Sequence, residues 1–221
     1  MDIFEKLKAL SAKRPQGKPE YIIAGLGNPG VEYDGTRHNT GFLVADRVIE
    51  LAEREGQCQA QSGRHFSCEL WRVKLDMLGG TWLVAKPTTY MNLSGQCVQP
   101  LLAWHRIKPG AMVVVHDELD IPPGALRFKF GGGNAGHNGL KSITEQMGTP
   151  NFYRLRIGIG RPPQRGDVTN WVLGRPFGED RERWEQALDA GLAVLEAFAA
   201  RGLEHAVRTA GEATKRILPP A

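Results

Sequence analysis

Strand-like and helix-like segments alternate along this chain, and the alternation limits the folds open to it. Residues 21–26 and 112–115 are almost wholly apolar, as buried strands are. Residues 41–54 and 179–200 carry apolar side chains at helical spacing. The same criteria predict strands at 66–70, 81–85, 126–130 and 154–159, and helices at 93–107, 140–147 and 203–217. The pattern predicts a single α/β domain, in which helices cover both faces of a mixed, twisted β-sheet.

The composition is that of an ordinary globular protein. Hydrophobic residues make up 41% of the chain and charged residues 24%. Cys58, Cys68 and Cys97 show no C-x-x-C spacing, which argues against a disulfide framework and a zinc site. The six histidines are scattered, and no H-E-x-x-H motif occurs, so we expect no bound metal. No apolar run reaches membrane-spanning length and no signal-peptide pattern is found, which favours the cytoplasm.

The first residues of the chain differ from the rest. Residues 1–14 have the pattern of a short charged helix, which Pro15 and Pro19 then interrupt. We expect residues 1–19 to form an extension and linker, and residues 20–221 to form the folded domain.

Basic residues are concentrated in one part of the sequence. The whole chain has a net charge of +4, yet residues 121–165 contain seven lysines and arginines and only one acidic residue. The strand predicted at 126–130 would carry Arg127 and Lys129 on one face, ~7 Å apart at ~3.4 Å per residue. Such a field suits a polyanion such as nucleic acid, and the simpler alternative is a solvated basic face.

A glycine-rich turn follows the first predicted strand. The stretch from Gly25 to Gly30 matches the G-x-G-x-x-G pattern of dinucleotide sites. That pattern requires a helix to begin at once, so that its N-terminus can meet the pyrophosphate. Here Asp34-Gly35 signals a second turn, and the helix is predicted to begin only near Thr40. We therefore expect no nicotinamide cofactor; an oxidoreductase is the rival that a cofactor titration would separate.

Two polar stretches lie where predicted strands and helices meet. His38 precedes the helix at 41–54, where the helix dipole favours a neutral imidazole that can take a proton from water. Asp117 follows the strand at 112–115, at the end where α/β proteins bind ligands. A carboxylate there can orient a histidine, and Asp120 is a second candidate for that partner. Taken singly, each residue could equally be a cap or a packing side chain.

Asparagines precede two further predicted helices. Asn92 comes shortly before the helix at 93–107, and Asn138 comes near the end of the glycine-rich stretch 131–139. Asparagine is a good N-cap, which is the simpler interpretation of each. The functional alternative is a fixed, uncharged donor and acceptor for an amide or ester substrate.

Six stretches, taken in order, resemble one known family. They read G-L-G-N-P-G, T-R-H-N-T-G-F, T-T-Y-M-N-L-S-G, H-D-E-L-D, G-G-G-N-A-G-H-N-G-L-K-S-I and F-Y-R-L-R-I-G-I-G-R-P. Their order and spacing are similar to those of the bacterial peptidyl-tRNA hydrolase family, from residue 21 to the C-terminus. The resemblance implies a monomeric enzyme, without metal or other cofactor, that cleaves the ester between a stalled peptide and the terminal ribose of tRNA.

The resemblance also implies roles for individual residues. His38 matches the catalytic histidine, Asp117 matches its carboxylate partner, and Asn138 matches an amide that assists the reaction. The residues that match the substrate-binding positions are Asn28, Tyr33, Met91, Asn92 and His137.

A tRNA-phosphate site is implied as well. Arg127 and Lys129 match the cations that grip the acceptor-stem phosphate, where the family typically carries two lysines. Arginine suits that task, because its planar fork matches phosphate oxygens. Arg156, on a neighbouring predicted strand, is a third candidate. A catalytically silent RNA-binding relative is the alternative, and the intact pair of His38 and Asp117 argues against it.

Overall fold

The computed structural model describes residues 17–163 and 167–219 and contains one seven-stranded sheet. Its strands, in spatial order, are β2 (Cys58–Gln61), β3 (Cys68–Val73), β4 (Trp82–Pro87), β1 (Tyr21–Gly25), β5 (Met112–Glu118), β7 (Tyr153–Gly158) and β6 (Leu126–Phe130). The four strands β4, β1, β5 and β7 run parallel, while β2, β3 and β6 pair antiparallel to their neighbours. The helix predicted within residues 1–14 lies outside the described residues.

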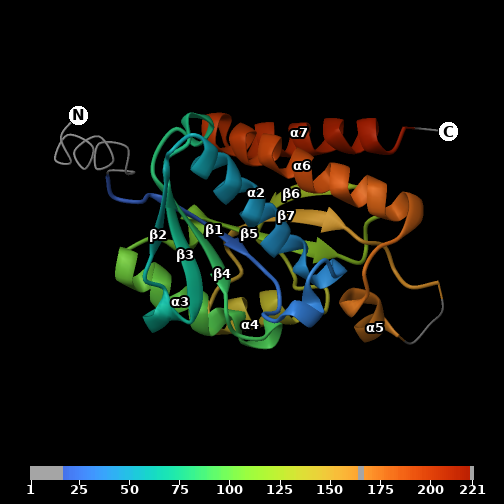
Figure 1. The fold of residues 1–221 in the computed structure, drawn as a ribbon, viewed down its shortest axis with the longest axis horizontal. Coiled ribbons are helices and arrows are strands. Elements are labelled where there is room, and N and C mark those ends of the chain that lie inside the picture. Colours follow the sequence, from blue (N-terminus) through green and yellow to red (C-terminus); the bar gives the residue numbers. More distant parts are fainter. Residues whose placement is uncertain (1–16, 164–166, 220–221) are drawn as a thin grey trace, which may run out of the picture.

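Helices cover both faces of this sheet, as the sequence predicts (Figure 1). On one face lie α2 (Thr40–Arg54), α6 (Gly178–Arg201) and α7 (Leu203–Ile217), and on the other lie α3 (Ser94–His105) and α4 (Asn138–Met147). Two apolar clusters fill the spaces between the layers. One holds Val44, Val115 and Leu188, and the other holds Ala24, Val114 and Leu140. No helix in the described part of the chain is long and apolar enough to cross a membrane.

The predicted fold class is confirmed, and the differences concern short elements. The sequence missed β2 because its residues are mostly polar and half-exposed, and missed α5 (Val168–Leu173) because six residues are too few for a periodic pattern. Phe66 belongs to a 3₁₀ turn, Arg64–Phe66, and not to a strand. The strand predicted at 112–115 continues to Glu118, so Asp117 lies within β5.

The first two glycines of the G-x-G-x-x-G stretch pack a helix against the sheet. A Cβ atom on Gly25 would lie 2.4 Å from the carbonyl oxygen of Gly41. One on Gly41 would lie 2.2 Å from both the nitrogen of Leu26 and the carbonyl oxygen of Val115. The start of α2 therefore touches β1 and β5 backbone to backbone. As the sequence predicts, α2 begins only at Thr40, after two 3₁₀ turns, and not directly after Gly30.

Candidate active site

A cleft of about 470 Å³ opens beyond the carboxyl ends of the central parallel strands. It is lined by seven of the residues that the sequence singled out: Asn28, His38, Met91, Asn92, Asp117, His137 and Asn138. Four further lining residues belong to α5. Residues far apart in sequence are brought together here because β1, β4 and β5 end side by side at this edge.

His38 and Asp117 form a buried pair in this cleft. His38 lies in the 3₁₀ turn Arg37–Asn39 just before α2, and Asp117 lies near the end of β5. The Nδ1 atom of His38 is 2.9 Å from Oδ1 of Asp117. Asp120 is instead exposed and pairs with Arg161 at 2.6 Å. The structure therefore brings Asp117, and not Asp120, to the histidine.

His137 is the second partner of the same carboxylate oxygen. Its Nε2 lies 3.1 Å from Oδ1 of Asp117, and its Nδ1 accepts hydrogen bonds from the backbone N–H groups of Gly139 and Leu140. His137 is thus the N-cap of α4. Because Nδ1 accepts, the proton of this ring is on Nε2 and is donated to Asp117.

These contacts shift the pKa values of both members of the pair. Burial lowers the pKa of His38, but the charge of Asp117 and the hydrogen bond to it outweigh burial, so the pKa is raised above its ordinary value. Burial acts to raise the pKa of Asp117, whereas the two histidines hold it well below its usual range. The start of α2 favours a neutral imidazole, but the carboxylate at hydrogen-bond distance raises the pKa of His38.

The asparagines differ in how they are held. The backbone N–H of Asn28 donates to Asn39, and the Oδ1 of Asn28 accepts a hydrogen bond from the backbone N–H of Met91 at 2.8 Å. This bond fixes the buried amide of Asn28 and leaves its NH₂ group to meet a ligand. Asn92 and Asn138 are exposed. Neither is the N-cap of its helix, since Leu93 precedes α3 and His137 caps α4.

Tyr33 does not line the cleft. It lies half-buried at the end of the 3₁₀ turn Val31–Tyr33. Its backbone carbonyl accepts from the hydroxyl of Thr36 at 2.8 Å, so it supports the turn that leads to His38. A direct contact of the Tyr33 side chain with substrate stays a prediction.

The predicted phosphate ligands lie on one sheet face beside the cleft. Arg127 on β6 pairs in register with Arg156 on β7, and Lys129 pairs with Arg154. Arg127 is exposed. Burial lowers the pKa of Lys129, and the charges of Arg156 and Arg154 lower it further. This concentration of positive charge at the β6 edge of the sheet favours binding of an anion.

Two charged residues at this face have partners that the sequence did not reveal. Arg156 binds Oε2 of Glu118 through Nε at 3.0 Å and Nη2 at 2.9 Å, so its charge is largely directed to a carboxylate that lines the cleft. Arg154 is fully buried and donates to the carbonyl oxygens of Gly132 and Gly133. It thereby holds the glycine-rich loop that leads to His137. Strand alternation places both arginines on the polar face but cannot show such contacts.

Three side chains could in principle hold a cation. One ligand atom from each of His38, Asp117 and His137 lies within 4.8 Å of the others. A metal on Nε2 of His137 would require a proton on Nδ1, which would then face the N–H groups of Gly139 and Leu140. The capping role of His137 therefore disfavours a metal ion at this cluster.

A buried histidine–aspartate pair in the cleft of a mixed α/β sheet is an arrangement that can activate water for hydrolysis. The family described as "Peptidyl-tRNA hydrolase" matches residues 22–217. The peptidyl-tRNA hydrolase of Desulfovibrio desulfuricans is 64% identical over 198 residues, which cover 90% of this chain and 86% of that protein. That of Nitratidesulfovibrio vulgaris is 52% identical over 191 residues, which cover 86% of this chain and 95% of that protein.

Solved structures agree with this assignment. The crystal structure of peptidyl-tRNA hydrolase from Acinetobacter baumannii matches with a TM-score of 0.79 at 35% identity, covering 88% of this chain and 96% of that one. The chain belongs to the peptidyl-tRNA hydrolase family, and it hydrolyses peptidyl-tRNA.

Proposed function

We propose that His38, oriented by Asp117, acts as the general base in this hydrolysis. The observation that carries the proposal is the 2.9 Å contact between Nδ1 of His38 and Oδ1 of Asp117 in the cleft. With the ring proton on Nδ1, the lone pair of Nε2 is available to deprotonate a water molecule. That water attacks the ester carbonyl between the peptide and the terminal ribose of tRNA. The carbonyl C–O bond to the ribose then breaks, and the ribose oxygen takes up the proton held by His38.

The neighbouring amide side chains bind the peptide and stabilise the intermediate that forms when water attacks. Asn138 orients the water or stabilises the developing oxyanion. Asn28 and Asn92 hydrogen-bond the peptide, while Met91, His137 and Tyr33 border its path. Arg127 and Lys129 bind an acceptor-stem phosphate, with Arg156 contributing charge from β7. We further propose that the enzyme works as a monomer in the cytoplasm without a metal, and that residues 20–221 form the catalytic domain.

Replacement of the base tests this proposal directly. His38→Ala should lower kcat for release of tRNA from N-acylated aminoacyl-tRNA by ~10²–10⁴-fold, because general-base assistance is lost. Binding of tRNA should change little. Asp117→Asn should also lower kcat strongly, with an unchanged circular dichroism spectrum.

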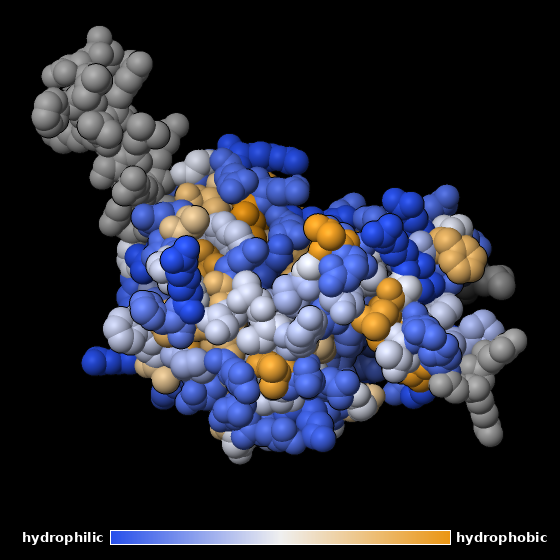
Figure 2. All heavy atoms as spheres, turned by 60° about the horizontal axis from the view of Figure 1, so that its bottom comes forward, coloured by the Kyte–Doolittle hydropathy of each residue, from blue (hydrophilic) through white to orange (hydrophobic). Residues whose placement is uncertain are grey.

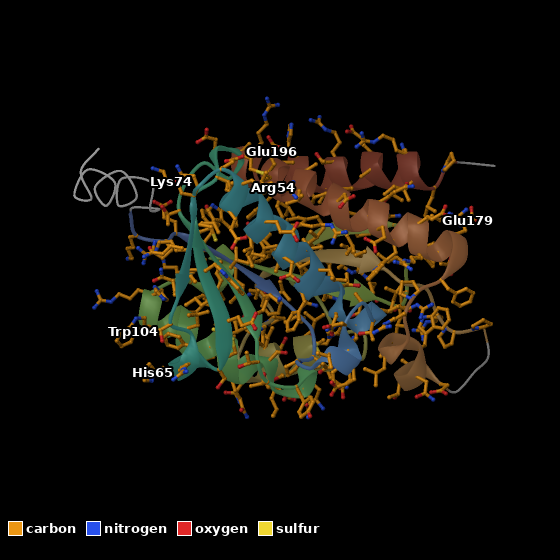
Figure 3. All side chains as sticks on the ribbon, in the orientation of Figure 1. Arg54, His65, Lys74, Trp104, Glu179 and Glu196 are labelled. Atoms are coloured by element: carbon orange, nitrogen blue, oxygen red, sulfur yellow. The ribbon has the colours of Figure 1, made fainter. Side chains whose placement is uncertain are left out.

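The matched control is His65→Ala, which removes an exposed histidine outside the cleft (Figure 3). Its kcat should equal that of the unaltered enzyme. Near-normal hydrolysis by His38→Ala would show that another group activates the water. A chelator added to the unaltered enzyme should leave the rate unchanged.

A further inference from the structure

Arg37 directly precedes His38, yet its long cationic side chain is turned into the protein. The residue is only 4% exposed. Its Nη1 donates hydrogen bonds to the carbonyl oxygens of Trp171 at 3.3 Å and Arg175 at 3.1 Å. Its guanidinium carbon lies 3.8 Å from the centroid of the Trp171 ring, within cation–π distance.

The backbone around Arg37 is tied down in the same region. Its N–H donates to the carbonyl oxygen of Gly174 at 3.0 Å. Its carbonyl oxygen accepts from the hydroxyl of Thr40 at 2.7 Å, and that hydroxyl accepts from the indole N–H of Trp184 at 2.9 Å. The turn that carries His38 is therefore held by contacts that join segments more than a hundred residues apart.

The segment that receives Arg37 forms a wall of the cleft. Val168, Thr169, Val172 and Leu173 of α5 all line it. The indole N–H of Trp171 donates to the carbonyl oxygen of Gly160 at 2.8 Å, which anchors the ring that Arg37 covers. One side chain thus connects the turn of His38 to the helix across from it.

The chemistry of Arg37 argues for more than stability. Within residues 17–163 and 167–219 it forms no ion pair, and its buried Nη2 has no hydrogen-bond partner. Burial lowers the pKa of Arg37, which the charge of Asp180 only partly opposes. A buried cation so incompletely paired is costly, and an apolar side chain would serve mere packing as well. What the guanidinium alone supplies is a fixed geometry between two segments.

We infer that Arg37 is a positioning residue for the hydrolysis reaction, which holds His38 against Asp117 and fixes it relative to α5. The inference rests on the proposed role of His38 as the base. A displacement of a reacting group by ~1 Å can cost ~10²-fold in rate, so a loosened turn should be visible in kcat.

The pH dependence of kcat separates positioning from folding. The titratable groups that face His38 are Asp117 on β5 and His137 before α4, while Glu118 in the same cleft is paired with Arg156. The α5 segment, VTNWVL, presents none. Since contact with Asp117 raises the pKa of His38, a looser contact should let it fall towards the ordinary value of ~6.5.

The test compares Arg37→Met, Arg37→Lys and the control Arg64→Met, which removes an exposed arginine outside the cleft. The substrate is N-acylated aminoacyl-tRNA, and the folded fraction is measured by near-UV circular dichroism. Arg37→Met should lower kcat ~10–100-fold and move the acidic limb of its pH profile to lower pH. Arg37→Lys should recover part of both effects, and Arg64→Met should match the unaltered enzyme.

Unchanged kcat in Arg37→Met, or a loss of kcat with the acidic limb in its original place, would overturn the inference. If Arg37→Met does not fold, Arg37→Lys is judged by the same two criteria. Failure of the proposed function looks different, because His38→Ala would then be active or the unaltered enzyme would show no acidic limb.

Discussion

One carboxylate oxygen, Oδ1 of Asp117, accepts hydrogen bonds from both His38 and His137. His137 is fixed by its capping bonds, so it holds Asp117 in place while Asp117 orients His38. Both ring nitrogens of His137 are hydrogen-bonded. In His38 only Nδ1 is bonded to Asp117, so Nε2 is available for the proposed proton transfer. Substitution of His137 would therefore disturb the pair even though the ring need not touch the reacting atoms.

His116, next to Asp117 on β5, makes folding stability depend on pH. It is 1% exposed, and its Nε2 has no hydrogen-bond partner in the described residues. Burial, reinforced by the charge of His137, lowers the pKa of His116 well below its ordinary value. As pH falls below ~6.5, the unfolded chain takes up a proton that the folded protein does not, so stability is lost.

We therefore expect the unaltered protein to lose about 1 kcal/mol more unfolding free energy than His116→Gln between pH 7.5 and pH 5.5. Urea denaturation at the two pH values measures the difference. Effects of His38 and Asp117 are common to both proteins and largely cancel. Equal losses in the two proteins would show that His116 becomes protonated in the folded state.

At the scale of whole elements, close backbone contact fixes where α2 begins. A methyl group at position 41 would meet the backbone of both Leu26 and Val115 at 2.2 Å, and neither can move cheaply. Gly41→Ala should lower the free energy of unfolding by about 3 kcal/mol. It should also lower kcat, because the turn of His38 leads directly into α2.

Gly211 supplies the matched control, since it lies within α7 and a Cβ there would meet nothing within 4 Å. Gly211→Ala should raise the free energy of unfolding by about 0.5–1 kcal/mol, because alanine has less backbone freedom to lose. Thermal or urea unfolding of both variants checks the pair. Equal changes in the free energy of unfolding would show that Gly41 is not required for close packing.

For the whole molecule, the distribution of charge matters more than its total. Figure 2 shows the side of α3 and α4 as largely hydrophilic, with only small separate apolar groups. Charged side chains such as Arg54 and Lys74 point outward elsewhere on the surface (Figure 3). The positive groups of β6 and β7 instead lie side by side in the sheet, and Arg156 contacts Glu118 at the cleft.

Replacement of both Arg127 and Lys129 by alanine should weaken tRNA binding and make it less dependent on salt. The slope of log Kd against log salt concentration should fall by about 1–2, since fewer counterions are released. Arg54→Ala with Lys74→Ala, which removes the same charge far from the cleft, should leave the slope unchanged. An equal slope in the first variant would exclude Arg127 and Lys129 from the phosphate site.

The sequence determined the elements and their class because these depend on local pattern. Apolar spacing placed the main strands and helices, and the position of Asp34-Gly35 showed that α2 begins late. Elements without a local pattern, such as α5 and β2, could not be found in this way. The ordered motifs, through their resemblance to a known family, indicated hydrolysis of peptidyl-tRNA.

Tertiary structure alone decided which side chains meet. His38 and Asp117 are 79 residues apart, and neither periodicity nor composition could have preferred Asp117 over Asp120. The binding of Arg156 to Glu118 and of Arg37 to α5 also depends on long-range packing. Local interactions determine whether a segment forms a helix or a strand. Distant polar groups come within hydrogen-bond distance only when the strand ends are arranged side by side, and this arrangement depends on sheet order and on contacts such as that of Gly41 with β1.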